Sequence, residues 1–192
     1  NKKFDIKIKK NIPQKAGMGG GSMNSATILK YLVKKKIINI SKKDVYKISN
    51  KIGSDVALGL ERKNSILFKN KRIARINAKL NFYVLLVKPN ISCSTKEIYR
   101  NVNNYSKSKY LTNNKLLFKT SNLIKSNNDL ETVVFRMHPK IKKLKYFLSK
   151  LPNVTFVRMT GSGSTIVAYF KSKNSIINGT KIFKRKYKNY WY

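Results

Sequence analysis

A glycine-rich segment near the start of the chain restricts the possible fold more than any other feature. It runs Pro13-Gln-Lys-Ala-Gly-Met-Gly-Gly-Gly-Ser22. Residues 3–10 before it alternate apolar and polar side chains, as a half-buried strand does. After it, apolar side chains recur at helical spacing, and we expect Ser22 to cap that helix. Strand, glycine loop and helix together would present backbone N–H groups and the positive end of a helix dipole to an anion.

The loop fits neither of the two commonest nucleotide-binding patterns. A Walker A loop ends in Gly-Lys-Ser/Thr, whereas Gly21 is followed by Ser22 and Met23. A Rossmann fingerprint needs a third glycine where Ser22 stands. From these residues alone, a phosphate-binding loop and a flexible glycine turn are both open.

The remaining pattern predicts mixed helices and strands, and therefore an α+β protein with a weak boundary near residues 78–88. We expect helices over 41–52 (capped by Ser41, with Asp44 in the first turn and Gly53 at the end), 95–102 (capped by Thr95), 129–136 (capped by Asp129) and 139–150. We expect strands over 65–69, 72–76, 82–87, 155–159 and 165–170, with 82–87 buried at the centre of a sheet and 103–114 a loop.

Only seven carboxylates occur in the chain, so each can be weighed. Four stand at predicted helix starts, where the helix dipole explains them, and two are expected to face solvent: Asp44, Glu97, Asp129 and Glu131, then Asp5 and Glu61. The seventh, Asp55, follows Gly53-Ser54 and precedes apolar residues, so we expect it to be buried beside a turn. A catalytic base and a cap for a helix beginning at Val56 are both open.

A second glycine turn, Met159-Thr-Gly-Ser-Gly-Ser-Thr165, separates the last two predicted strands. It could line the same pocket as the first glycine loop and bring hydroxyl groups near phosphates. An ordinary hairpin turn is the alternative.

Composition excludes several classes of function. One cysteine, Cys93, and one histidine, His138, allow neither an internal disulfide nor a Cys/His metal site. No apolar run is long enough to span a membrane and no signal peptide is evident, so a cytoplasmic protein without a membrane partner is expected. The formal charge of +36 suggests nucleic acid, but lysines are dispersed along the whole chain. Only 181–192 concentrates basic and aromatic residues, so we expect no specific nucleic-acid partner.

The motifs together resemble those of GHMP kinases. The segment Pro13–Ser22 is similar to their second, glycine-rich motif, in the extended form typical of the branch that phosphorylates 4-diphosphocytidyl-2-C-methyl-D-erythritol. Ile52-Gly-Ser-Asp-Val56 resembles the catalytic-aspartate segment, and Arg158–Thr165 the third motif. Ser94-Thr-Lys-Glu-Ile-Tyr99 and Asn128-Asp-Leu-Glu131 resemble two further stretches of that branch, in the same order.

The chain also departs from the family pattern. It lacks the Pro-Ala-Lys-x-Asn segment that supplies a catalytic lysine, so we expect it to start within the N-terminal domain. It is expected to stop inside the final Trp-containing strand, at 189–192. Met23 replaces a serine and Val56-Ala57 replaces Val-Pro, which would loosen the turn after Asp55.

The resemblance implies a GHMP kinase fold, with a truncated ribosomal-S5-like N-terminal domain over 1–77 and a ferredoxin-like C-terminal domain over 78–192. It implies transfer of the γ-phosphoryl group of ATP, with Mg²⁺, to the 2-hydroxyl of the cytidylylated methylerythritol, a small-molecule partner, by a monomer or homodimer. A basic nucleic-acid-binding module of S5-like topology and a catalytically inactive fragment of the kinase are the alternatives.

The resemblance also assigns roles to individual residues. Asp55 would orient or deprotonate the acceptor hydroxyl, Thr95 is a weaker candidate for substrate contact, and Ser22 would approach the Mg²⁺ that comes with ATP. The residues expected to bind ATP are Pro13, Gln14, Lys15, Ala16, Gly17, Met18, Gly19, Gly20, Gly21, Ser22, Met23, Gly161, Ser162 and Gly163.

Overall fold

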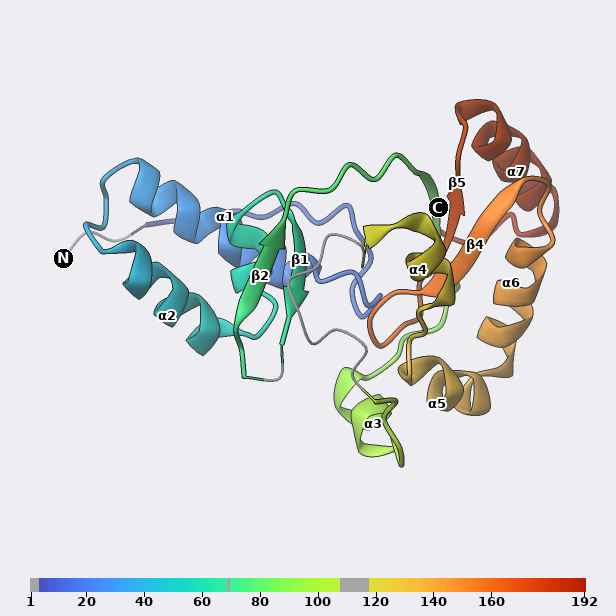
Figure 1. Ribbon diagram of the computed structural model, residues 1–192, viewed down its shortest axis with the longest axis horizontal. Coiled ribbons are helices and arrows are strands. Elements are labelled where there is room, and N and C mark those ends of the chain that lie inside the picture. The colour runs from blue at the N-terminus through green and yellow to red at the C-terminus, as the bar shows by residue number, and fades with distance from the viewer. Residues whose placement is uncertain (1–3, 69, 108–117) are drawn as a thin grey trace.

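The computed structural model describes residues 4–68, 70–107 and 118–192 and confirms the α+β class. Figure 1 shows two groups of elements. The first holds α1 (Gly20–Lys34), α2 (Lys42–Ile52), the short 3₁₀ helix η1 (Ala57–Leu60), β1 (Asn64–Leu67) and β2 (Ile73–Ile76). The second holds β3 (Tyr83–Val87), α3 (Thr95–Arg100), α4 (Thr120–Lys125), α5 (Leu130–Met137), α6 (Pro139–Ser149), β4 (Val154–Met159), β5 (Ile166–Phe170) and α7 (Lys173–Lys186). The predicted division into 1–77 and 78–192 stays a prediction.

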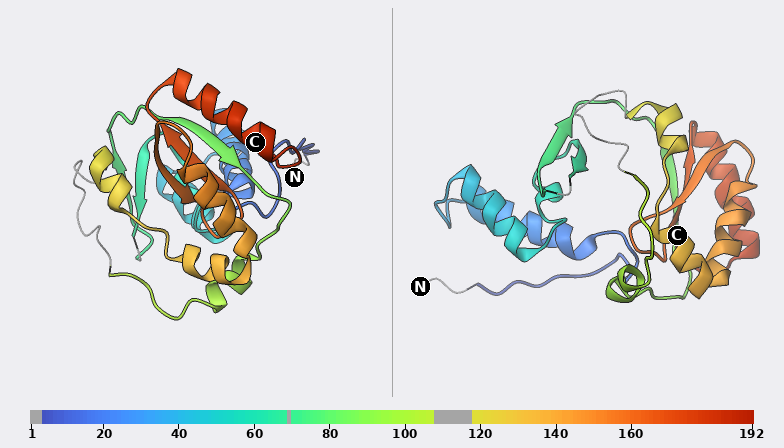
Figure 2. Two further views of the ribbon diagram at one scale, coloured as in Figure 1. Left: turned by 90° about the vertical axis from the view of Figure 1, so that its right-hand side faces the viewer. Right: turned by 60° about the horizontal axis from the view of Figure 1, so that its bottom comes forward.

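The predicted N-terminal strand is wrong for its described residues. Residues 4–10 form no strand, and Phe4 and Ile6 are each 53% exposed. Figure 2 shows this segment running away from both sheets. Alternation marks an apolar face, but a strand also needs a hydrogen-bonded neighbour, and no strand among the described residues pairs with 4–10.

Helix α1 begins at Gly20, so the prediction that Ser22 caps it is wrong. Gly19 is the N-cap, with φ 64°, and makes no side-chain cap bond. This left-handed residue turns the chain into the helix, a role that glycine fills without steric cost. Helix α1 then buries Ala26 and Leu29. Helix α2 agrees with the prediction, because Ser41 Oγ accepts a hydrogen bond from Asp44 N–H at 3.1 Å.

The sheets confirm the five strands predicted after the glycine loop but correct the position of one. Strands β1 and β2 form an antiparallel hairpin, and the second sheet has the order β3-β5-β4. Strand β3 is therefore an edge strand, not the predicted central one, and Tyr83 at its start is 45% exposed. Its outer edge is paired at one point, where Lys88 and Trp191 exchange backbone hydrogen bonds of 2.9 and 3.1 Å.

Two of the predicted helix caps are corrected. Helix α3 is capped by Ser94, whose Oγ accepts from Glu97 N–H at 3.4 Å, so Thr95 is the first helical residue and not the cap. Asp129 stands at the N-cap of α5 but makes no cap bond with its side chain. It accepts two bonds of 3.0 Å from Ser106 instead. The loop predicted over 103–114 is irregular through 107, and the rest of it lies outside the described residues.

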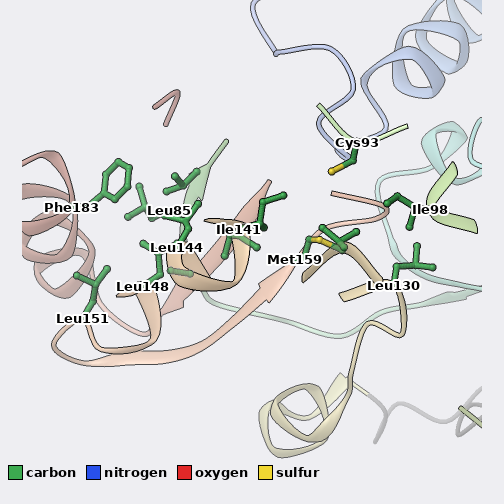
Figure 3. Close-up of a cluster of buried hydrophobic side chains, with 14 of the residues drawn as sticks. Leu85, Cys93, Ile98, Leu130, Ile141, Leu144, Leu148, Leu151, Met159 and Phe183 are labelled. Atoms are coloured by element: carbon green, nitrogen blue, oxygen red, sulfur yellow. The ribbon is translucent and has the colours of Figure 1, made fainter. Parts of the chain in front are cut away.

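The main hydrophobic core lies between the three-stranded sheet and the helices that pack against it. Helices α6 and α7 cover one face of the sheet (Figure 1). Figure 3 shows the core extending from Phe183 and Leu151 at one end to Cys93, Met159, Ile98 and Leu130 at the other. This second end packs against the turn between β4 and β5, since a Cβ on Gly163 would lie within 3.4 Å of Met159 Sδ and Cys93 Sγ.

The basic and aromatic segment 181–192 turns its rings toward this core. Phe183 is fully buried and stacks on Tyr187 at 5.4 Å, and Tyr187 stacks on Tyr190 at 5.0 Å. The lysines between them are exposed. This arrangement agrees with a solvated basic face, and the absence of a specific nucleic-acid partner stays a prediction. Within the described ranges no helix is long and apolar enough to cross a membrane, and the cytoplasmic location also stays a prediction.

Candidate active site

One pocket brings together most of the predicted site residues. It has a volume of about 820 Å³ and lies where the first glycine loop meets the β4–β5 turn, α3 and the turn that carries Asp55. The predicted residues in its lining are Pro13 to Ser22, Asp55, Thr95, Gly161 and Ser162. Lys9, Lys10, Asn11, Ile12, Asn24 and Tyr99 also line it, and sequence reasoning missed them.

The two glycine segments touch through their backbones. Gly17 has φ 70°, and a Cβ there would lie 2.3 Å from the carbonyl oxygen of Thr160. Gly161 has φ 52°, and its Cβ would lie 2.7 Å from the carbonyl oxygen of Gly17. Thr160 Oγ1 donates to that same oxygen at 3.0 Å, and Thr165 N–H donates to Ala16 at 3.3 Å. We call these contacts the glycine junction, and they require glycine at both positions.

The next three glycines face open space. A Cβ on Gly19, Gly20 or Gly21 would meet no atom within 4 Å. The first intrahelical bond of α1 is Met23 N–H to Gly19 at 2.9 Å, so the N–H groups at the start of the helix are left for another acceptor. No acidic residue stands in this first turn. A phosphate group fits here, because it can approach the bare backbone at the positive end of the helix dipole.

The stretch Asn128–Glu131 holds the second glycine turn in place. Asn128 Nδ2 donates to the carbonyl oxygens of Met159 and Gly161 at 3.0 and 2.8 Å. Glu131 Oε1 accepts from Met159 N–H at 2.7 Å, and its other oxygen pairs with Lys145 at 2.5 Å. Sequence reasoning explained Glu131 by the helix dipole alone, and the structure gives it this second contact.

Two residues predicted to bind ATP lie away from the pocket lining. Gly163 is buried behind the glycine junction, where a Cβ would lie 2.9 Å from Met159 Sδ and 3.4 Å from Cys93 Sγ. Met23 faces η1, since a Cβ on Gly59 would lie 2.9 Å from its sulfur. Two residues of the pocket lining contact each other, since Thr95 Oγ1 and Ser162 Oγ form a 2.9 Å hydrogen bond.

Asp55 is exposed, so the prediction that it is buried is wrong. The apolar residues that follow it, Val56 and Ala57, take the buried positions of the turn, at 1% and 0% exposure. The alternative of a capping Asp55 also fails, because Val56 is the N-cap of η1 and no side chain caps it. The Asp55 carboxylate accepts one long bond of 3.5 Å from Ser54 Oγ and faces the pocket.

Tyr99 lies in the same pocket lining and was missed from sequence. It is 52% exposed and stands four residues after Thr95, on the same face of α3. Burial of its hydroxyl group raises the pKa of Tyr99, and the neighbouring Tyr105 and Asp55 raise it further. The ring is therefore neutral at physiological pH. The i, i+4 spacing from Thr95 was the signal that could have identified it.

The described residues contain no group of three or more His, Cys, Asp or Glu that could hold a metal ion. Ser22, the predicted Mg²⁺ contact, lies in the pocket lining at the start of α1. Ser22 directly follows Gly21, so its hydroxyl is the polar side-chain group nearest in sequence to the open glycines.

Comparisons with known proteins agree on one family. Residues 1–62 match the family described as GHMP kinases N terminal domain, and residues 110–189 match GHMP kinases C terminal. A 4-diphosphocytidyl-2-C-methyl-D-erythritol kinase of Pelagibacter ubique is 49% identical over 191 residues, covering 100% of this chain and 68% of the relative. The enzyme of the same name from Prochlorococcus marinus (strain MIT 9215) is 30% identical over 208 residues, covering 97% of this chain and 67% of the relative.

Solved structures show the same fold. A crystal structure of 4-(cytidine 5'-diphospho)-2C-methyl-D-erythritol kinase superposes with a TM-score of 0.75 at 20% identity, over 92% of this chain and 65% of that one. A homoserine kinase from Cytophaga hutchinsonii superposes with a TM-score of 0.70 at 15% identity, over 95% and 65%. The chain thus spans about two thirds of the length of the relatives it matches.

Proposed function

Because the chain belongs to the 4-diphosphocytidyl-2-C-methyl-D-erythritol kinases of the GHMP kinase family, we propose that its pocket transfers the γ-phosphoryl group of ATP to the 2-hydroxyl of that cytidylylated alcohol. The reaction is a step of non-mevalonate isoprenoid synthesis. The observation that carries the proposal is that exposed Asp55 and the open glycines at the start of α1 line the same pocket.

The glycine loop is proposed to hold the phosphates of ATP. Phosphoryl transfer depends mainly on positioning and on neutralising charge, and free N–H groups at a helix start provide both. Lys9, Lys10 and Lys15 also line the pocket and add positive charge around it. Gly161 and Ser162 close the pocket on its other side, where the glycine junction fixes their distance from the loop.

Asp55 is proposed to act on the acceptor. Its carboxylate is exposed to the pocket and, among the described residues, has only the long bond from Ser54, so it can accept a hydrogen bond from the acceptor hydroxyl and take its proton. Tyr99 presents a neutral ring in the same pocket, and a flat aromatic face suits stacking against a nucleobase such as the cytosine of the acceptor.

Mg²⁺ is proposed to enter with ATP. This ion is usually held by one or two carboxylates, waters and the phosphates of a substrate rather than by a protein cage. Ser22 is placed to approach it from the start of α1, and the ion would supply neutralisation of the phosphate charge.

The test uses a protein in which this chain is completed by the segments of the Pelagibacter relative that it does not span. ADP release is measured with 4-diphosphocytidyl-2-C-methyl-D-erythritol and, as controls, with homoserine, mevalonate and galactose. We expect turnover only with the cytidylylated acceptor. Turnover with a control alcohol and none with the cytidylylated one would refute the proposal, and a parallel assay of the 192-residue chain tests the alternative of an inactive fragment.

A further inference from the structure

The position of Asp55 depends on the backbone of its turn. Two bonds close the turn around it: Val56 N–H donates to Gly53 at 3.1 Å, and Leu58 N–H donates to Asp55 at 3.2 Å. Within the part of the chain that the structure describes, the carboxylate itself is held only by the 3.5 Å bond from Ser54. Contacts that fix η1, which begins two residues after Asp55, therefore also fix where the carboxylate points.

Arg75 on β2 holds η1 through two of its carbonyl groups. Its Nη1 donates to the carbonyl oxygen of Leu58 at 2.9 Å, and its Nη2 donates to that of Ala57 at 2.5 Å. Nη1 also donates to Ser65 Oγ on β1 at 2.7 Å. A planar guanidinium can hold two successive carbonyl groups at once, which a lysine cannot do with the same geometry. Arg75 does not line the pocket.

A second contact ties this cluster to α2. Tyr46 OH donates to Glu61 Oε1 at 2.7 Å, directly after η1. The hydrogen bond from Tyr46 lowers the pKa of Glu61, and the charge of Arg75 lowers it further. The bonds of Arg75 and Tyr46 thus join α2, η1 and the β1–β2 hairpin next to the turn that carries Asp55.

We propose that Arg75 is a positioning residue for the phosphoryl-transfer step, which holds the carbonyl groups of Ala57 and Leu58 and so aims Asp55 into the pocket. This inference rests on the proposed function for its kinetic consequence. Arg75 does not line the pocket, yet it would supply the rigidity that the turn of Asp55 needs.

The kinetic test compares two arginines of one hairpin in the completed protein. Arg75→Gln removes the grip on η1, whereas Arg72→Gln makes the same charge change at a residue that lies over the Phe68 ring, 4.6 Å from its centroid. We expect Arg75→Gln to lower kcat by about 10- to 100-fold, the cost of misplacing a catalytic group by about an ångström, with the KM for ATP changed less than about twofold. Arg72→Gln should leave both values unchanged.

A double-mutant cycle separates positioning from general damage. If Arg75 acts through Asp55, then Arg75→Gln in an Asp55→Asn background should lower kcat by less than about twofold more, because residues that act as a unit are not additive. An equal loss in both backgrounds, or no loss in the single variant, would overturn the proposal. Ser65→Ala, which removes only the hydroxyl that Arg75 contacts, should show a smaller loss of kcat and keeps the test valid if Arg75→Gln does not fold.

Hydrogen exchange tests, without any substrate, whether the bonds from Arg75 hold η1. The N–H groups of Leu58 and Gly59 donate to the carbonyl oxygens of Asp55 and Val56 at 3.2 and 3.0 Å. We expect both amides to exchange at least about tenfold faster in Arg75→Gln than in Arg72→Gln. Unchanged exchange would overturn the proposal whatever the activity. An inactive parent protein would instead refute the proposed function, and the exchange result would still decide whether Arg75 holds the turn.

Discussion

Replacing Gly17 by alanine should break the glycine junction. A methyl group there would lie 2.3 Å from the Thr160 carbonyl oxygen and 2.8 Å from two atoms of Gly163, all of them backbone. The φ of 70° costs a non-glycine residue about 1–2 kcal/mol. Separating the loops also loses the bonds from Thr160 Oγ1 and Thr165 N–H, each contributing about 1 kcal/mol. We therefore expect Gly17→Ala to destabilise the chain by about 3–4 kcal/mol.

Urea unfolding of the 192-residue chain, followed by circular dichroism, measures this difference. Gly20→Ala is the matched control, because a Cβ there meets nothing within 4 Å and alanine is favoured over glycine in a helix by about 0.5–1 kcal/mol. The control should be as stable as the parent or slightly more stable. In thermal unfolding, Gly17→Ala should melt about 10 °C lower. A Gly17→Ala protein within about 0.5 kcal/mol of the parent would refute the reasoning.

Three further outcomes are expected. Asp55→Asn in the completed protein should lower kcat by about 10²- to 10⁴-fold and leave ATP affinity nearly unchanged, and weakened ATP binding with an intact kcat would contradict this. Gly20→Val should weaken ATP binding itself, measured by titration with a fluorescent ATP analogue, because a branched side chain would occupy the open space before the helix N–H groups. Glu61→Gln should be less stable than the parent at neutral pH. The pKa of Glu61 in the folded chain lies below its usual 4.5, so the stability that the carboxylate contributes is present above that pH and is lost as the pH falls through the folded pKa. The urea unfolding curves of Glu61→Gln and the parent should therefore converge in acid. A stability difference that stays constant with pH would contradict this prediction.

Features that depend on nearby residues could be predicted from the sequence. The helix after Ser41 was predicted with its cap and its end, because Ser41, Asp44 and Gly53 interact within a few residues of one another. Helix starts were less certain, as the shift from Thr95 to Ser94 shows, because adjacent hydroxyl residues offer the same cap chemistry. The predicted strand over 3–10 failed because pairing depends on a partner strand that local alternation does not reveal.

The candidate site was predicted in its parts but not in its assembly. The two glycine motifs and Asp55 were identified from spacing and resemblance, yet Thr160 and Gly17 are 143 residues apart and their contact cannot be deduced from either motif. The exposure of Asp55 was mispredicted because the neighbouring Val56 and Ala57 are buried while the side chain of Asp55 turns outward. Tyr99 was missed because its only signal was the i, i+4 spacing from Thr95, which was itself a weak candidate for substrate contact.

The glycine junction has a consequence for how this sequence can evolve. Its contacts come largely from main-chain atoms, so selection there acts on which φ angles a residue permits and hardly on side-chain chemistry. Exposed positions, where most of the lysines stand, take no part in these contacts. A chain with 43 basic and only 7 acidic residues is therefore compatible with this junction, provided that no substitution adds a Cβ at Gly17 or Gly161.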